Sequence, residues 1–316
     1  MKLAFLFAGQ GSQVPGLGKE LYDAFPQVRP IYDEPQPGFD LREISFEAPM
    51  EVISQTRYTQ PCMVAFAAAV TRLLREEGLR PDYAAGLSLG EYSALCCAGV
   101  LDPRTAVELA AFRGRAMEEA AAGRSTGMTA LLGVTPETAE ECCRRAREET
   151  GLTAEVANLN CPGQVVIGGD APAVERAAAL AREAGAKRCL PLNVSGPFHT
   201  SLMAPAGKAL AERFQTLAFA PMGRTQVVFN TTARPLDAAA GETVPGLLVR
   251  QVQSPTLFEE SIRWMASQGV DTVVEIGPGK VLSGFVKKIA PETALYQAQD
   301  AGSIREIGEA LKGAQL

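Results

Sequence analysis

The stretch Gly86-Leu87-Ser88-Leu89-Gly90-Glu91-Tyr92 follows the G-x-S-x-G pattern of a nucleophile elbow, in which a strand turns sharply into a helix. The residues before it, 83–86, are short and apolar like a buried strand end, and residues 91–98 after it favour a helix. Ser88 would then lie exposed at the helix N-terminus, where the helix dipole favours developing negative charge. Because the pattern is short, a glycine-flanked turn with an incidental serine remains an equal alternative.

Composition and charge restrict the class of protein. The chain has 316 residues, 47% of them hydrophobic and 21% charged, which predicts an ordinary globular protein with a large core and more than one domain. The net charge of −6 argues against general nucleic-acid binding. The seven cysteines are odd in number and form no C-x-x-C motif, so we expect neither disulfides nor a metal site. This use of cysteine fits a protein of the reducing cytoplasm. No apolar run approaches the roughly 20 residues of a membrane span, so no membrane partner is expected.

Strands and helices alternate along most of the chain, which predicts an α/β fold with a mostly parallel sheet. Residues 126–198 have the order β-α-β-β-α-β of a ferredoxin-like unit. We therefore expect a discontinuous large α/β domain of residues 1–125 and 199–316, and an inserted ferredoxin-like subdomain of residues 126–198. Outside the subdomain the pattern predicts strands over 3–8, 226–230 and 272–276, and helices over 61–77, from 102 onward, and over 201–214, 255–268 and 280–289.

The loop after the first expected strand contains Gly9-Gln10-Gly11, a strand-to-loop pattern that also occurs in dinucleotide sites. Val14 stands where such a site would need its third glycine, which argues against that interpretation. The alternative is a loop whose backbone approaches a reacting group closely and points N–H groups at it.

A serine hydroxyl is a poor nucleophile unless a base accepts its proton, and histidine is the usual base. His199 is the only histidine, in a loop where the expected subdomain returns to the large domain. A lone histidine is commonly structural, but this position together with an elbow serine favours catalysis. In α/β-hydrolases the histidine comes late in the chain after an acid. Here more than 100 residues follow His199 and no obvious acid accompanies it, which weakens an esterase or thioesterase interpretation.

Arg113 lies beside the apolar face that Leu109, Phe112 and Ala116 form on the helix after the elbow helix. One interpretation is a solvated or ion-paired arginine. The other is a binding group for a substrate carboxylate, because guanidinium and carboxylate groups match in a bidentate geometry.

These residues carry a resemblance to the malonyl-CoA:acyl-carrier-protein transacylases, the stand-alone acyltransferases of bacterial fatty-acid synthesis. The matching segments follow the family's order across nearly the whole chain, and together they are specific although each is short. The family's fold is a hydrolase-like α/β core with a ferredoxin-like insert. The segments are Phe7-Ala8-Gly9-Gln10-Gly11-Ser12-Gln13, residues 88–95, Arg113-Gly114, residues 160–167, Gly196-Pro197-Phe198-His199, Val249-Arg250-Gln251 and residues 277–282.

The resemblance implies a role for each site residue and a ping-pong reaction without a bound cofactor. Malonyl would pass from malonyl-CoA, a coenzyme A thioester, to the serine, and then to the phosphopantetheine thiol of holo acyl carrier protein. The implied roles are Ser88 as nucleophile, His199 as base and later acid, the backbone N–H groups of Gln10 and Leu89 as oxyanion donors, Arg113 as the carboxylate-binding group, and the Gln251 backbone carbonyl as the group that orients the histidine.

Two residues bear on substrate choice. The family commonly has histidine before the serine, where this chain has Leu87, which leaves open any contact that histidine makes to substrate. Phe198 resembles the malonyl-selecting version of related polyketide acyltransferases, because a bulky side chain there would crowd an α-methyl group. The competing interpretations are a serine hydrolase, and a polyketide-pathway acyltransferase with another carrier or extender unit.

An acidic carrier protein would need a local basic patch on this acidic chain. The adjacent pairs Lys187-Arg188 and Lys287-Lys288 are the expected docking residues, with ordinary solvated surface as an equal alternative.

Overall fold

The computed structural model describes residues 1–312, and the chain divides into two compact units. Unit 1 comprises Met1–Arg115, Ala218–Phe229 and Ile262–Leu316, and unit 2 comprises Ala116–Leu217 and Asn230–Ser261. The expected subdomain 126–198 falls inside unit 2, and its separation from the rest of the chain stays a prediction. The last four residues of the expected large domain, 313–316, lie outside the described residues.

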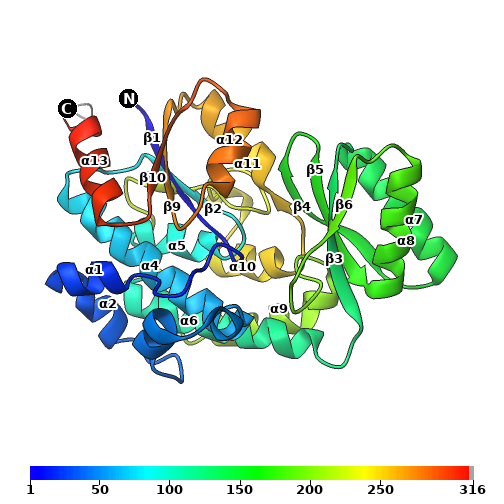
Figure 1. Cartoon of the computed structure of the whole chain (residues 1–316), viewed down its shortest axis with the longest axis horizontal. Coiled ribbons are helices and arrows are strands. Elements are labelled where there is room, and N and C mark those ends of the chain that lie inside the picture. The colour runs from blue at the N-terminus through cyan, green and yellow to red at the C-terminus, as the bar shows by residue number, and fades with distance from the viewer. Residues whose placement is uncertain (313–316) are drawn as a thin grey trace. The chain divides into compact units, whose positions relative to one another are not determined.

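Unit 1 is built on a parallel sheet (Figure 1). The central strand β1 is an apolar run in which every residue is fully buried, as expected for a strand covered on both faces. All strand pairs in this sheet are parallel, which confirms the predicted mostly parallel sheet. The strands lie in the order β10 (Ala294–Ala298), β9 (Thr272–Ile276), β1 (Leu3–Phe7), β2 (Tyr83–Gly86) and β7 (Gln226–Val227).

Helix α5 (Gly90–Cys97) packs on β1 and β2, and the long helix α4 (Thr56–Glu76) packs on α5. The expectation that this long helix begins at Pro61 is wrong, because it begins at Thr56 and Pro61 lies in its second turn. A proline favours the first turn of a helix, but Pro61 lies further inside this one and removes an intrahelical hydrogen bond there. Thr59 and Gln60, which precede it, are buried within the helix and do not mark its start.

The remaining elements of unit 1 are helical. Residues 26–61 contain several short helical turns for which the sequence analysis gave no signal. The remaining helical elements of unit 1 are α1 (Lys19–Ala24), η1 (Pro26–Val28), α2 (Arg29–Asp33), η2 (Glu43–Glu47), α3 (Met50–Ile53), α12 (Val281–Ile289) and α13 (Ala301–Leu311). Helix α6 (Pro103–Ala121) begins in unit 1 and ends in unit 2. No helix within residues 1–312 has the length and apolar character needed to span a bilayer.

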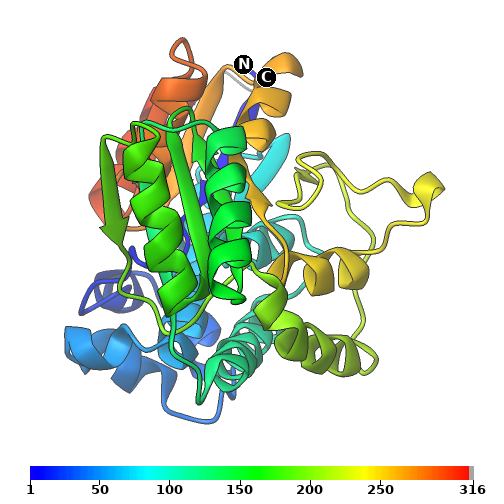
Figure 2. The ribbon, with the colours of Figure 1, turned by 90° about the vertical axis from the view of Figure 1, so that its right-hand side faces the viewer.

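Unit 2 contains a second sheet, in the order β6 (Arg188–Pro191), β3 (Thr126–Leu132), β5 (Gln164–Asp170), β4 (Ala154–Cys161) and β8 (Thr256–Leu257). Figure 2 shows α7 (Pro136–Thr150) and α8 (Ala171–Glu183) side by side over one face of this sheet. Small residues on these helices, including Ala139 and Ala177, pack against Leu131 and Ile167 of the sheet to form the core. The chain order β3-α7-β4-β5-α8-β6 confirms the predicted ferredoxin-like order.

The sequence prediction of a helix from residue 255 is wrong at its start. Thr256 and Leu257 form strand β8, which pairs in parallel with β4, and α11 (Phe258–Ser267) begins only afterwards. A side-chain hydrogen bond of 2.7 Å from Asn158 to Thr256 adds to this pairing, so tertiary contacts decide the local structure. The other elements of unit 2 are η3 (Ser201–Met203), α9 (Ala204–Phe214), η4 (Ala238–Ala240) and α10 (Val244–Val252).

Candidate active site

Ser88 sits on a sharp turn between β2 and α5. Its backbone φ is +54°, in the left-handed region that residues other than glycine rarely adopt. The glycines on either side permit the turn: a Cβ on Gly86 would lie 2.0 Å from a backbone carbon of Gly90, and a Cβ on Gly90 would lie 2.2 Å from the Phe7 carbonyl oxygen. The turn therefore has the strained strand-turn-helix backbone of a nucleophile elbow.

Arg113, on α6, is 1% exposed, so the interpretation of a solvated arginine is wrong. Its Nη2 donates a 3.1 Å hydrogen bond to the Ser88 hydroxyl oxygen, and its Nη1 donates a 3.0 Å hydrogen bond to Oε1 of buried Gln60. Its guanidinium carbon also lies 5.2 Å from the ring centroid of Tyr92, within the range of a cation–π contact. The structure thus holds a guanidinium in a fixed orientation directly beside the serine.

Burial sets the electrostatics around this arginine. It lowers the pKa of the Arg113 guanidinium, while the neighbouring Tyr92 and Glu91 act in the opposite direction. The pKa of the Tyr92 hydroxyl is raised, mainly by burial. Arginine stays charged even when its pKa falls, so the site contains a desolvated cation next to the Ser88 hydroxyl. A negatively charged group entering the site would interact with this cation strongly, because little water is present to screen it.

The loop at Gln10 and the elbow before Leu89 are both anchored by hydrogen bonds. The Gln10 side chain donates a 2.9 Å hydrogen bond to the Thr56 hydroxyl, which anchors the loop after β1. The elbow is tied to the same strand by a 3.1 Å hydrogen bond from Leu87 N to the Phe7 carbonyl. Within residues 1–312, the backbone N–H groups of Gln10 and Leu89 donate no hydrogen bond, so both are available to a developing oxyanion.

His199 belongs to unit 2 and is held there by the end of α10. It is 3% exposed, its φ is +63°, and its backbone N–H donates a 3.2 Å hydrogen bond to the Val252 carbonyl. Its Nδ1 lies 2.8 Å from the backbone carbonyl oxygen of Gln251, the contact that the resemblance implies. A carbonyl can only accept, so Nδ1 carries the proton and Nε2 keeps the lone pair of a base. The carbonyl occupies the orienting position that a carboxylate holds in a Ser-His-Asp triad.

The other residues that the sequence analysis named differ in how far they are buried. Phe198 is buried beside Gly196, where a Cβ would come within 3.1 Å of its ring, and Leu87 is half-buried. The four basic docking candidates are exposed: Lys187 and Arg188 at the start of β6, and Lys287 and Lys288 in the last turn of α12. No group of three or more metal-ligating side chains is assembled within the described residues.

Sequence reasoning missed the residues that surround Arg113. Gln60, Glu91 and Tyr92 are all fully or almost fully buried there. Glu91 and Tyr92 stand inside the elbow stretch itself, which gives a weak signal, whereas nothing in the sequence marks Gln60 as a partner of an arginine 53 residues away.

The family model of the acyl transferase domain matches residues 4–314. The chain belongs to this family. It is therefore an acyltransferase, and relatives of known function extend over nearly its whole length. It is 41% identical over 313 residues to the malonyl CoA-acyl carrier protein transacylase of Bacillus subtilis (strain 168), covering 98% of each chain. The protein of the same description from Escherichia coli (strain K12) is 40% identical over 292 residues, covering 91% of this chain and 93% of the relative.

Solved structures resemble this acyltransferase throughout its length. The crystal structure of MCAT from Streptococcus pneumoniae has a TM-score of 0.91 and 46% sequence identity, and the match covers 98% of this chain and all of that one. A type II PKS acyl-carrier protein in complex with its malonyl-transacylase has a TM-score of 0.92 and 37% identity, over 98% of this chain and all of that chain. The α/β fold with a mostly parallel first sheet is thus that of the acyltransferases.

Proposed function

We propose that this acyltransferase moves the malonyl group of malonyl-CoA to the phosphopantetheine thiol of holo acyl carrier protein, through a malonyl-Ser88 intermediate, for fatty-acid synthesis. The names of the relatives support this donor and acceptor, and one solved relative is bound to a carrier protein. The observation that carries the choice of acyl group is the buried guanidinium of Arg113, whose Nη2 lies 3.1 Å from the Ser88 hydroxyl oxygen.

A malonyl group suits this arginine. Its carboxylate is one methylene away from the thioester carbonyl, so a carbonyl carbon at Ser88 brings the carboxylate to a cation beside that serine. The site must exclude water to protect an acyl-serine, and an unpaired carboxylate in such a site is costly. The planar guanidinium compensates that charge with two parallel hydrogen bonds and fixes the orientation of the acyl group. An acetyl group gains nothing from this arrangement.

In the proposed first half-reaction, Nε2 of His199 accepts the Ser88 proton while Oγ attacks the thioester carbonyl carbon. The carbonyl oxygen becomes an oxyanion bound by the N–H groups of Gln10 and Leu89, each such donor being worth about 3 kcal/mol. When the tetrahedral intermediate collapses, the carbon–sulfur bond breaks and the imidazolium returns its proton to the coenzyme A sulfur. Malonyl-Ser88 remains, with its carboxylate on Arg113.

The second half-reaction repeats these steps with the carrier thiol. His199 accepts the thiol proton, the sulfur attacks the ester carbonyl of malonyl-Ser88, and the proton passes to Oγ as the carbon–oxygen bond breaks. The products are malonyl carrier protein and free enzyme. The 2.8 Å contact from Nδ1 to the Gln251 carbonyl supports this double role, because it keeps the same ring nitrogen available in both halves. No bound cofactor takes part, and a cytoplasmic location stays a prediction.

Two-substrate kinetics with analysis of the products tests the proposal. We expect parallel lines in double-reciprocal plots of initial rate against malonyl-CoA at several carrier concentrations, with malonyl carrier protein as the product. Free malonate as the main product would instead identify a hydrolase. Parallel assays with a fatty-acid carrier and a type II polyketide carrier separate the two pathways, and a clear preference for the polyketide carrier would overturn the assignment to fatty-acid synthesis.

A further inference from the structure

The first two turns of α4 contact two groups of the candidate site at once. Thr56, the first residue of the helix, is 1% exposed, and its hydroxyl oxygen accepts the 2.9 Å hydrogen bond from the Gln10 side chain. Gln60, also 1% exposed, accepts the 3.0 Å hydrogen bond from Nη1 of Arg113. Neither Thr56 nor Gln60 takes part in the proposed chemical steps, and both belong to unit 1 together with the groups that they contact.

Helix geometry fixes how far apart these two contacts lie. Residues four apart stand on the same face of an α-helix, about 6 Å apart along its axis. Helix α4 is long and most of its residues are buried, so packing holds its first turns in place as well as its own hydrogen bonds. The loop that contains Gln10 and the guanidinium of Arg113 are therefore attached to one rigid helix face at a set spacing.

The backbone around Arg113 rests on the same part of α4. A Cβ on Gly114, the next residue of α6, would lie 2.8 Å from the Thr56 carbonyl oxygen and 2.9 Å from Cα of Arg57. Glycine permits this close approach of the two helices, and a larger residue there would push them apart. Arg113 is therefore held twice by α4, through this backbone contact and through Gln60.

The backbone before Gln10 is fixed in a similar way by the elbow. A Cβ on Gly9 would lie 2.6 Å from the Leu87 carbonyl oxygen, so the loop passes directly against the elbow there. The Gln10 side chain then reaches Thr56 and attaches the loop to α4 as well. Loss of the Thr56 hydroxyl would remove this attachment and leave the backbone N–H of Gln10 less precisely placed.

We propose that Thr56 and Gln60 are positioning residues for the acyl transfer, a proposal that rests on the malonyl-transfer function given above. Thr56 holds the backbone N–H of Gln10 where the oxyanion forms, and Gln60 holds the guanidinium of Arg113 where the carboxylate binds. In a malonyl group one methylene separates the reacting carbonyl from the carboxylate, so the two binding groups must lie at a matching distance. One face of α4 sets that distance, and a displacement of about 1 Å in such a site costs on the order of 100-fold in rate.

A role of the two residues in folding alone would give a different pattern of effects. Every acyl group forms an oxyanion, so a disturbed Gln10 loop slows the loading of all acyl groups alike. Malonyl has a carboxylate and acetyl has none, so a displaced Arg113 slows malonyl loading far more than acetyl loading. Reduced stability, by contrast, lowers the amount of active enzyme and therefore both loading rates by the same factor, whichever residue is changed.

Rapid-quench measurements of Ser88 loading with malonyl-CoA and acetyl-CoA separate these cases. Thr56→Val keeps the side-chain shape but removes the hydroxyl, and should lower both rates by about tenfold or more without changing their ratio. Thr56→Ser keeps the hydroxyl and should restore most of both rates. Gln60→Met keeps the side-chain length but removes the acceptor for Arg113, and should lower the malonyl-to-acetyl ratio by about tenfold or more.

Removing the other partner of the Thr56 contact gives a second measurement, which stays valid if Thr56→Val does not fold. Gln10→Met removes the side-chain donor but keeps the backbone N–H, and should reproduce the uniform loss of both rates. Combining Gln10→Met with Thr56→Val should cause no larger loss than either change alone, because both remove the same hydrogen bond.

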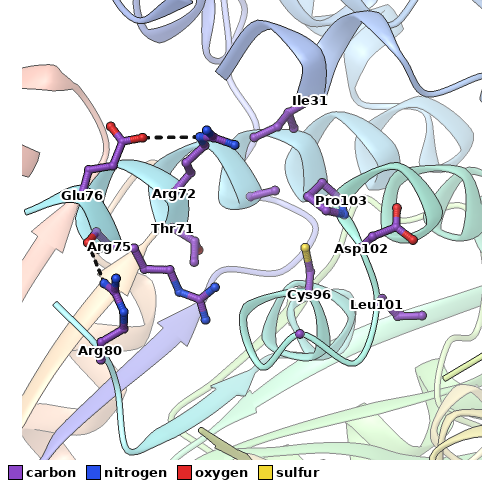
Figure 3. A pocket seen from close by; sticks show the side chains of 12 residues that line it. Ile31, Thr71, Arg72, Arg75, Glu76, Arg80, Cys96, Leu101, Asp102 and Pro103 are labelled. Carbon is purple, nitrogen blue, oxygen red and sulfur yellow. Dashed lines mark hydrogen bonds and ion pairs between the residues drawn. The ribbon is translucent and has the colours of Figure 1, made fainter. Parts of the chain in front are cut away.

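Thr71→Val is the matched control. Thr71 is a buried threonine of the same helix, and its hydroxyl donates a 2.7 Å hydrogen bond to the Ala67 carbonyl. It lies about 22 Å from Thr56 along the helix axis. Figure 3 shows it there among the residues that line a cavity of unit 1. The change should lower the melting temperature at most, and leave both loading rates unchanged.

Two results would overturn the positioning roles even when the native protein loads malonyl as proposed. One is a loss of malonyl and acetyl loading by the same factor in Gln60→Met. The other is native loading by both Thr56→Val and Gln10→Met. Failure of the native protein to load malonyl onto Ser88 would instead overturn the proposed function, and the positioning roles with it.

Discussion

Replacing Arg113 with alanine should change which acyl group the enzyme loads. Arg113 is 1% exposed, and its guanidinium donates hydrogen bonds to the Ser88 hydroxyl and to Gln60. Removing one partner of a buried, hydrogen-bonded charge pair costs about 2–5 kcal/mol, which corresponds to a loss of malonyl loading of roughly 30-fold to several thousand-fold.

Acetyl loading separates this effect from general damage. Loss of the hydrogen bond to Ser88 affects every substrate, and a hydrogen bond from a charged donor is worth about 1.5–3 kcal/mol, or roughly 10- to 150-fold. The malonyl group, unlike the acetyl group, also loses the guanidinium that would pair with its carboxylate. The ratio of malonyl to acetyl loading should therefore fall by about 30-fold or more. Arg113→Lys should restore part of the ratio, since a point charge cannot reproduce the fork.

Rapid-quench measurements of acyl-enzyme formation with malonyl-CoA and acetyl-CoA provide the rates. Arg115→Ala is the matched control, because Arg115 lies on the same helix, is exposed, and donates a 2.8 Å hydrogen bond to the Pro37 carbonyl. It should leave the ratio unchanged. Thermal unfolding of each variant shows how much of any loss comes from reduced stability. If Arg113→Ala reduces the loading rates of malonyl and acetyl by the same factor, Arg113 is structural and the carboxylate is bound elsewhere.

Three further predictions concern the base, the acyl pocket and the carrier. His199→Ala should lower the steady-state transfer rate by roughly 10²–10⁴-fold, and near-native activity would exclude His199 as the base. Phe198→Ala should raise the use of methylmalonyl-CoA relative to malonyl-CoA by about 10–200-fold in competition assays, and an unchanged ratio would show that the ring does not select. Reversing the charges of Lys287 and Lys288 to glutamate should slow transfer to carrier protein without slowing malonyl loading; equal losses in both half-reactions would indicate a folding defect instead of impaired docking.

Local patterns predicted the parts of the structure that depend on neighbours in sequence. The elbow at Ser88 requires a glycine on each side within a few residues, and those glycines stand in the same stretch. The β-α-β-β-α-β order of unit 2 likewise follows from successive apolar runs and turns. The start of the long helix at Thr56 and strand β8 at Thr256 were not predicted, because a proline inside a helix and a pairing with distant β4 override the local signals.

For the candidate site, the sequence indicated which residues to consider but not all of their contacts. His199 was identified because the composition offers one histidine. The resemblance to the family indicated Arg113, but its near-complete burial and its contact with Gln60 depend on how α4 and α6 pack within the fold.

The most direct test of the central claim is the mass of the intact protein after brief incubation with malonyl-CoA, followed by addition of holo acyl carrier protein. We predict a single malonyl adduct that maps to Ser88, is absent from Ser88→Ala, and moves quantitatively to the carrier when the carrier is added. Malonyl carrier protein formed by Ser88→Ala at the native rate, or an adduct that decays to free malonate while the carrier stays unmodified, would contradict transfer through Ser88.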